Sequence, residues 1–148
     1  MAVKASIIIP TFKRNAILKQ CLRSIKQCHM QDIEVIVVND DSNNTLQPEA
    51  FEYPFNTRFV NNSGKGVASA RNSGAKLATA DIFIFVDDDM LLNSKCIEQA
   101  IQFIQERSNC TYNANWEYEP NLLAELGKNS FGRFLIDTGH TTLEGWNR

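Results

Sequence analysis

Residues 82–89, with the sequence IFIFVDDD, decide the fold. Five apolar residues in succession predict a long strand, and three aspartates follow directly at its end. Residues 33–42, IEVIVVNDDS, have the same form, because an almost wholly apolar run breaks abruptly into polar residues. Such a run is typical of a strand that a parallel sheet buries on both faces. The sequence therefore predicts two core strands whose carboxyl ends carry acidic side chains.

The segments around these two strands predict the remaining elements. We expect further strands at 3–9 and 58–60, and helices at 15–28, 67–78 and 94–106. Pro10 should end the first strand because proline has no N–H to donate, and Ser94 should cap the last helix. This alternation predicts an α/β, Rossmann-like fold with a mostly parallel sheet flanked by helices.

The pattern weakens after residue 107. A strand at 109–119, a helical turn at 121–126 and another short segment at 131–136 are compatible with it. No repeat, low-complexity tract or charge run indicates a second domain. We therefore expect an α/β core at 1–107 and a continuation of the same domain at 108–148.

Composition sets limits on the function. The chain has 148 residues with 43% hydrophobic content, which is the usual size of one domain. Its 15 Lys and Arg residues nearly balance 17 Asp and Glu residues, so no global charge favours nucleic acid or an anionic membrane. The short apolar run before Pro10 is too brief for a signal peptide or a membrane span, and we expect a cytoplasmic protein with reduced cysteines.

Polar and acidic loops follow three of the expected strands. Ligands of open α/β sheets collect outside the carboxyl ends of the strands, which here are residues 10–14, 39–42 and 87–89. Three successive carboxylates repel one another unless they are solvated or a cation neutralises them. Hard oxygen ligands suit Mg²⁺ or Mn²⁺, and such a site keeps positions for phosphate oxygens. A single acidic strand end is unremarkable, but two in one sheet favour a ligand site.

A glycine-bracketed loop, with Gly64 and Gly66 on either side of Lys65, precedes the helix that carries Arg71. Glycine lets the backbone approach a phosphate or a base closely. The dinucleotide fingerprint and the Walker pattern are both absent, which argues against an NAD, FAD or P-loop domain. A nucleotide bound without a P-loop is the remaining interpretation.

Four segments resemble inverting GT-A glycosyltransferases of family 2. Residues 6–12, SIIIPTF, look like the family's opening strand and P-T-Y-N loop, and residues 37–42, VVNDDS, resemble its V-V-D-D-G-S turn. Residues 66–74, GVASARNSG, are similar to its G-x-x-x-A-R-N-x-G helix start, and residues 85–89, FVDDD, to its D-x-D metal motif. The motifs occur in the family's order, and the likeness covers about residues 3 to 107.

The resemblance implies a nucleotide-sugar-binding core and assigns roles to individual residues. Asp40 would accept from a uracil-type base edge, Pro10 and Thr11 would line the base pocket, and Arg71 would assist nucleotide binding. Asp87 or Asp88 would contact the ribose or the donor sugar, and Asp89, with Asp87, would bind Mn²⁺ or Mg²⁺ at the diphosphate. The full set of nucleotide-binding candidates is Pro10, Thr11, Phe12, Arg14, Asp40, Asp41, Gly66, Arg71, Asp87 and Asp88.

The chain departs from the family pattern in ways that bear on the donor and the acceptor. Asn39 replaces the first acid of the turn, Asp41 replaces a small residue, and Lys13 with Arg14 replaces the usual Asn. The family's general base, an Asp, is expected beyond the end of this chain, so a truncated domain stays open. Candidates in the tail are assigned no role; they are the ionisable Asp137, His140 and Glu144 and the aromatic Trp116, Tyr118 and Trp146.

Three functions remain open at this point. The first is a metal-dependent, inverting transferase that moves a sugar, preferably from a UDP-sugar, to a saccharide or other hydroxyl acceptor. The second is a non-catalytic or incomplete nucleotide-sugar-binding module that needs further chain or a partner. The third, a sugar-nucleotide pyrophosphorylase, is disfavoured because the first strand lacks a Gly-rich loop. The resemblance also allows peripheral membrane association, and a homo-oligomer is compatible with the sequence.

Overall fold

The computed structural model describes residues 2–48, 51, 53, 56–107, 109–112, 114 and 120–137. The chain divides into two compact units, Met1–Cys110 and Thr111–Arg148. The expected assignment of both segments to one domain, with a boundary at residue 107, stays a prediction. Trp116, Tyr118, His140, Glu144 and Trp146 lie outside the described residues, as does most of the strand expected at 109–119.

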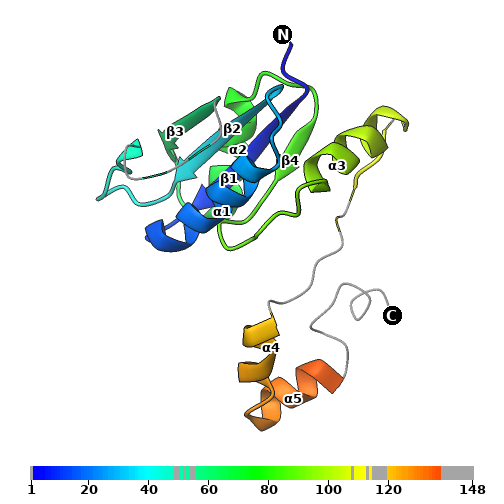
Figure 1. Ribbon diagram of the computed structural model, residues 1–148. Coiled ribbons are helices and arrows are strands. Elements are labelled where there is room, and N and C mark those ends of the chain that lie inside the picture. Colours follow the sequence, from blue (N-terminus) through cyan, green and yellow to red (C-terminus); the bar gives the residue numbers. More distant parts are fainter. Residues whose placement is uncertain are drawn as a thin grey trace. The chain divides into compact units, whose positions relative to one another are not determined.

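The first unit is built on a four-stranded parallel sheet. Its strands are β1 (Ala5–Thr11), β2 (Ile33–Asn39), β3 (Thr57–Asn61) and β4 (Phe83–Phe85). The order across the sheet is β3-β2-β1-β4, and every pairing is parallel (Figure 1). Both β1 and β2 are buried along their whole length, as expected of central strands with helices on both faces.

Helices cover the two faces of the sheet. On one face, α1 (Asn15–Gln27) and α3 (Cys96–Gln105) contribute Leu22 and Ile97 to the larger hydrophobic core. On the other face, α2 (Val67–Leu77) packs against β1 and β2 (Figure 1). A Cβ on Gly74 of α2 would lie 2.4 Å from Ile8 Cγ2, so only glycine allows this close approach of helix and sheet.

Pro10 does not end the first strand, which continues to Thr11. The hydrogen bonds along β1 explain why. Ile8 accepts from Val86 on the β4 side, whereas Thr11 accepts from Asp40 on the β2 side. Pro10 follows Ile8 by two positions and so directs its nitrogen to the β4 side, where β4 has already ended. The missing N–H therefore breaks no ladder hydrogen bond.

The last strand is shorter and more exposed than its sequence predicts. The expected strand at 82–86 contracts to the three residues of β4, at the edge of the sheet. Phe83 and Phe85 project on the α2 side of the sheet, beside Ser6 and Ile8, and remain 45% and 49% exposed. The apolar run indicated a strand but not its position at an edge.

Ser94 is not the N-cap of α3, so that prediction is wrong. Lys95 occupies the cap position, and no side chain makes a capping hydrogen bond. Asn93 organises the turn before the helix instead, because its side-chain oxygen accepts from the Lys95 N–H at 3.1 Å and its backbone oxygen from the Cys96 N–H at 3.0 Å.

A buried carboxylate connects three strands at the amino-terminal end of the sheet. Glu34 Oε1 accepts from Ser6 Oγ at 2.7 Å and from both the N–H and the hydroxyl of Thr79. Its other oxygen pairs with Arg58 at 2.7 Å. Burial alone raises the pKa of Glu34, but these hydrogen bonds and the Arg58 charge outweigh it and hold the pKa below its usual value.

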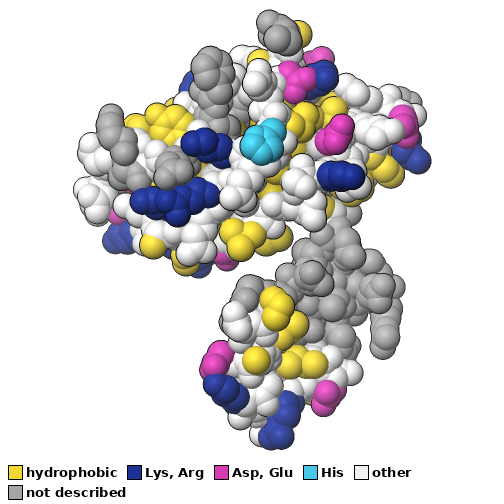
Figure 2. All heavy atoms as spheres, viewed as in Figure 1, with side chains coloured by type: hydrophobic (Ala, Val, Ile, Leu, Met, Phe, Trp, Pro, Cys, Tyr) yellow, Lys and Arg dark blue, Asp and Glu magenta, His cyan; other side chains and the backbone are white. Residues whose placement is uncertain are grey.

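The described residues of the second unit form two short helices. They are α4 (Pro120–Leu126) and α5 (Ser130–Asp137), at the positions where the sequence indicated a helical turn and a further segment. Phe131 and Phe134 stack with ring centroids 6.5 Å apart, and both are largely exposed. Hydrophobic side chains reach the surface of both units (Figure 2). Among the described helices, none has the length and apolar character that crossing a membrane requires.

Candidate functional site

Thr11 contacts the two acidic strand-end loops at 39–42 and 87–89. It is the last residue of β1, and its backbone oxygen accepts from the Asp40 N–H at 2.8 Å. Its hydroxyl donates to Asp88 Oδ2 at 2.7 Å, and both side chains are buried. The strand-end loops at 10–14, 39–42 and 87–89 therefore meet at one edge of the sheet, as expected for the carboxyl ends of parallel strands.

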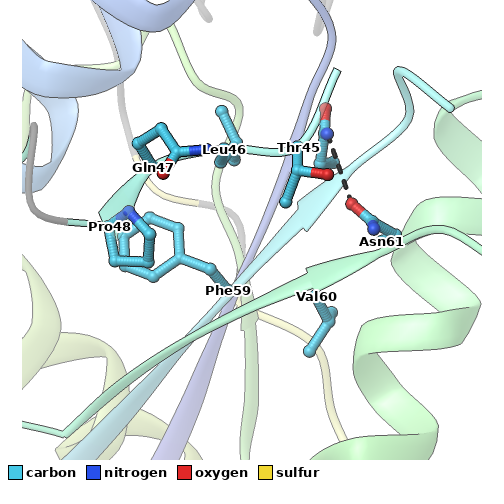
Figure 3. Close-up of a pocket in the computed structure, with 8 residues that line it drawn as sticks. Thr45, Leu46, Gln47, Pro48, Phe59, Val60 and Asn61 are labelled. Carbon is cyan, nitrogen blue, oxygen red and sulfur yellow. Dashed lines mark hydrogen bonds between the residues drawn. The ribbon is translucent and has the colours of Figure 1, made fainter. Parts of the chain in front are cut away.

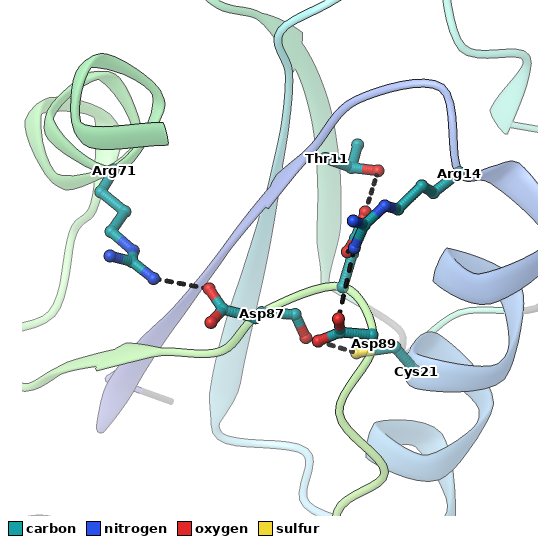
Figure 4. Close-up of polar contacts among 7 residues, drawn as sticks. Thr11, Arg14, Cys21, Arg71, Asp87 and Asp89 are labelled. Atoms are coloured by element: carbon teal, nitrogen blue, oxygen red, sulfur yellow. Dashed lines mark hydrogen bonds and ion pairs between the residues drawn. The ribbon is translucent and has the colours of Figure 1, made fainter. Parts of the chain in front are cut away.

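Two arginines pair with the three neighbouring aspartates. Arg14 Nη1 lies 3.3 Å from Asp88 Oδ1 and 3.2 Å from Asp89 Oδ2, and Arg71 Nη2 lies 2.5 Å from Asp87 Oδ1. Figure 4 shows Arg71 reaching Asp87 from α2, while Arg14 approaches Asp89 from the loop before α1. The carboxylates of Asp87 and Asp89 are each 54% exposed, whereas that of Asp88 is 7% exposed. Asp87 and Asp89 are therefore the two accessible acids of the turn.

The donor atoms at this turn fit one kind of metal site and not another. Within the described residues, no group of three or more His, Cys, Asp or Glu side chains comes together to enclose an ion. Mg²⁺ and Mn²⁺ are, however, often held by one or two carboxylates and completed by substrate phosphates. Exposed Asp87 and Asp89 fit that second arrangement. Because two guanidinium groups already offset two of the three negative charges, repulsion among the aspartates does not by itself require a metal.

Arg71 carries a buried donor without an acceptor. Its Nε atom is buried and has no hydrogen-bond partner, the one such side-chain nitrogen or oxygen in the described part of the chain. Buried polar groups are nearly always satisfied, so an orphaned donor next to an ion pair calls for an explanation. An oxygen atom of a bound ligand would supply the missing acceptor.

Cys21 lies next to the aspartate turn, and its thiol is buried. Its Sγ is 3.8 Å from the Asp87 backbone oxygen. Burial and the charges of Asp88, Asp89 and Asp87 raise the pKa of the Cys21 thiol to about 12. The thiol therefore stays protonated at neutral pH and is no nucleophile. The Cys21 side chain is fully buried and belongs to the larger hydrophobic core.

The Asp40 carboxylate is held by the loop before α2. Gly66 N donates to both Asp40 oxygens, at 3.0 and 2.9 Å, and Asn62 Nδ2 donates to Oδ1 at 2.6 Å. Gly66 has a φ of 89°, a left-handed conformation that favours glycine and turns its N–H toward Asp40. The predicted ligand residues Asp40 and Gly66 are thus in direct contact.

Two other predicted residues have mainly local contacts. Asp41 is buried, and its Oδ1 accepts from the Asn43 N–H at 3.1 Å, so it holds the turn after β2. Phe12 is half exposed, with Lys13 Nζ 5.1 Å from its ring centroid. Direct nucleotide contacts by Asp41, Asp88 and Phe12 stay predictions.

Asn62 is the residue that sequence reasoning missed. The sequence drew attention to the glycines of its loop, but the hydrogen bonds converge on this asparagine. One signal was present, because Ser69 and Ser73 are four apart on α2 and so lie on one helix face, toward the preceding loop. The acceptor that they share could not be read from their spacing.

A separate hollow of about 300 Å³ lies between the carboxyl-terminal halves of β2 and β3 and the loop after β2. Phe59 and Pro48 lie at one end of it, and Asn61, which accepts from Asn39 Nδ2 at 3.4 Å, lies at the other (Figure 3). Its lining contains no charged side chain. The hollow therefore lacks the carboxylate and guanidinium groups that are present at the aspartate turn.

The chain matches a known protein family over most of its length. The sequence profile described as glycosyl transferase family 2 matches residues 6–136 of the chain. The chain belongs to glycosyl transferase family 2. The fold that the resemblance implied, a GT-A type Rossmann-like sheet flanked by helices, is thereby confirmed.

Individual members of family 2 agree with this assignment. An uncharacterized glycosyltransferase of Haemophilus influenzae is 32% identical over 108 residues, which cover 72% of this chain and 36% of that protein. A validoxylamine A glucosyltransferase of Streptomyces hygroscopicus subsp. jinggangensis is 32% identical over 102 residues, covering 65% of this chain and 24% of that protein. This chain therefore corresponds to about a quarter to a third of the length of these relatives.

The fold also matches a solved family 2 structure. Residues 1–349 of S. aureus TarS, crystallised in complex with UDP, superpose with a TM-score of 0.58 at 27% sequence identity. The match covers 72% of this chain and 32% of the TarS chain. The part of this chain that superposes on TarS is similar in length to the first unit, Met1–Cys110.

Proposed function

We propose that the protein binds a nucleotide-sugar, with UDP-sugar preferred, and transfers its sugar with inversion to a hydroxyl acceptor. The observation that carries this proposal is the meeting of two exposed aspartates, Asp87 and Asp89, with two arginines and Asp40 at one sheet edge. Membership of family 2 and the UDP bound to the TarS relative support the choice of donor.

The base and ribose would be held where β1 and β2 end. Asp40 is fixed by backbone and amide donors, and its remaining lone pairs are available to accept from the imide N–H of uracil. Pro10 and Thr11 would form the adjoining wall, with Phe12 beside it. Asp87 is the exposed acid next to α2 and is suited to the hydroxyls of the ribose or donor sugar.

The diphosphate would bind between the two arginines. Arg71 has an unpartnered Nε, and Arg14 reaches the turn from the opposite side. Planar guanidinium groups bind phosphate oxygens through paired N–H donors. Both arginines would then exchange carboxylate partners for phosphate oxygens, which frees Asp87 and Asp89.

Asp89, with Asp87, would hold Mn²⁺ or Mg²⁺ in that state. When bound, such an ion acts as a Lewis acid that stabilises the charge growing on the leaving nucleoside diphosphate. The protein's own contribution is to orient the diphosphate through Arg14 and Arg71. Inverting transfer also needs a base that removes the acceptor proton, and we assign none of the described residues to that role.

Isothermal titration tests the donor site. UDP should bind the protein about tenfold more tightly with Mn²⁺ than without it, and Asp89→Ala should abolish that difference. Asp81→Ala is the matched control, because Asp81 is an exposed aspartate at the opposite end of β4. Binding that ignores both the metal and the Asp89 substitution would defeat the metal-dependent part of the proposal.

A second candidate is a nucleotide-sugar-binding module that needs further chain or a partner for turnover. The observation in its favour is that the chain covers 36% or less of the relatives compared above. The two candidates differ in a simple assay. Release of UDP from UDP-sugars by this chain supports the transferase, whereas nucleotide binding without turnover supports the module.

A further inference from the structure

Asn62 is the centre of a hydrogen-bond cluster at the start of α2. Its side-chain oxygen accepts from Gly64 N at 3.2 Å, Ser69 Oγ at 3.1 Å and Ser73 Oγ at 3.0 Å. A backbone N–H can only donate, so the atom that faces Gly64 has to be the oxygen. The amide orientation of Asn62 is thereby determined, and its NH₂ group has to point the other way.

The NH₂ group of Asn62 points at Asp40. The distance from Asn62 Nδ2 to Asp40 Oδ1 is 2.6 Å, which is short for a hydrogen bond to a carboxylate. Gly66 N donates to both oxygens of the same carboxylate. Asp40 therefore meets three donor contacts on its α2 side, and only its remaining lone pairs are available to a ligand.

We propose that Asn62 is a positioning residue that sets the Asp40 carboxylate for recognition of the nucleotide base. This inference rests on the proposed function, since it takes Asp40 as the acceptor of the base N–H. A carboxylate turned by rotation about its χ angles would present its lone pairs in another direction. The Asn62 amide, held by two serines of α2, removes that freedom.

The chemistry of the bases makes the role measurable. Uracil presents an N–H donor to a carboxylate at the position where cytosine presents a ring-nitrogen acceptor. A correctly aimed Asp40 therefore favours UDP over CDP, and a misaimed one loses that preference. If Asn62 had a purely structural role, its substitution would lower the affinity for UDP and for CDP alike.

The test is isothermal titration of UDP and CDP, each with Mn²⁺, against the protein and its variants. Asn62→Ala should lower UDP affinity about tenfold and change CDP affinity by less than about twofold. Asn61→Ala is the matched control, because Asn61 is the neighbouring asparagine and its Oδ1 accepts from Asn39 rather than contacting Asp40. In an Asp40→Ala background, Asn62→Ala should have no further effect on UDP.

Three results would overturn the inference. They are unchanged UDP affinity in Asn62→Ala, an equal loss of UDP and CDP affinity in Asn62→Ala, and a full effect of Asn62→Ala in the Asp40→Ala background. If Asn62→Ala does not fold, the double variant Ser69→Ala/Ser73→Ala keeps the amide but releases its oxygen. It should show a smaller loss confined to UDP, and an equal loss for both nucleotides again overturns the role.

Failure of the proposed function gives a different pattern. In that case the unsubstituted protein binds neither nucleotide, or Asp40→Ala leaves UDP binding unchanged. Intact UDP binding that depends on Asp40 but not on Asn62 rejects the positioning role alone.

Discussion

The Thr11 hydroxyl donates a hydrogen bond to Asp88 at 2.7 Å, and this contact joins the first and last strands of the sheet at the candidate site. Both side chains are buried, so the Asp88 carboxylate depends on protein donors. Thr11→Val keeps the shape and removes the donor, and we expect it to lower the free energy of unfolding by about 1–3 kcal/mol. Urea denaturation measures the loss, and Thr11→Ser should restore most of it. A Thr11→Val protein as stable as the original would mean that water replaces the hydroxyl.

Arg14 competes with a metal ion for Asp89. In Arg14→Ala the Asp89 carboxylate loses its guanidinium partner, so Mn²⁺ affinity without nucleotide should rise about two- to fivefold, in line with an exposed ion pair. UDP affinity in the presence of Mn²⁺ should fall, because a positive charge next to the diphosphate is lost. Calorimetry with Mn²⁺ alone and with UDP separates the two effects. Arg107→Ala, at the end of α3, should change neither, and unchanged Mn²⁺ affinity in Arg14→Ala contradicts the competition.

The Glu34 cluster predicts a pH dependence of stability. The pKa of Glu34 is lower in the folded protein than its ordinary value of 4.5. The ionised Glu34 side chain therefore makes its full contribution to the free energy of unfolding above pH 4.5. This contribution is lost as the pH falls through the pKa of Glu34 in the folded protein. Urea unfolding from pH 7 to pH 3 should show this loss on top of that from other carboxylates. Glu34→Gln should be less stable at neutral pH and should flatten the acid limb; an unchanged slope would assign the acid sensitivity to other groups.

Gly74 is required for the approach of α2 to β1. The Cβ of Gly74→Ala would lie 2.4 Å from Ile8 Cγ2, and the Ile8 side chain is fully buried. We expect a loss of about 1–3 kcal/mol, measured by thermal or urea unfolding. Gly127→Ala is the comparison, since a Cβ there meets its nearest atom at 3.6 Å. Equal stability of the two variants would show that α2 can shift away from the sheet.

The strands and the place of the site could be predicted because they depend on local patterns. The run at 33–39 is apolar on both faces and turns polar within one residue, which marks both a buried strand and its carboxyl end. The same reasoning placed Asp40 and Asp89 at one sheet edge. The resemblance to family 2 then led to the prediction that the ligand is a nucleotide-sugar.

The errors and omissions have a common physical cause. Whether Pro10 ends a strand depends on how far the strand on the side of its nitrogen extends, and the cap of α3 depends on a turn made by Asn93. The pairing of Arg14 with Asp89 spans 75 positions, and the link from Asn62 to Asp40 spans 22. Such contacts follow from the packing of whole helices and strands, and the spacing of residues along the chain does not predict them.

The position of β4 has a consequence for the lifetime of the site. All three aspartates of the turn follow the shortest strand, which pairs with a single neighbour at the edge of the sheet, whereas Thr11 ends one interior strand and Asp40 follows the other. Local unfolding of β4 would disorder the acidic turn while β1, β2 and β3 remain paired. In hydrogen exchange, amides of 83–89 should open sooner than those of 33–39, and an added nucleotide should slow the first group most.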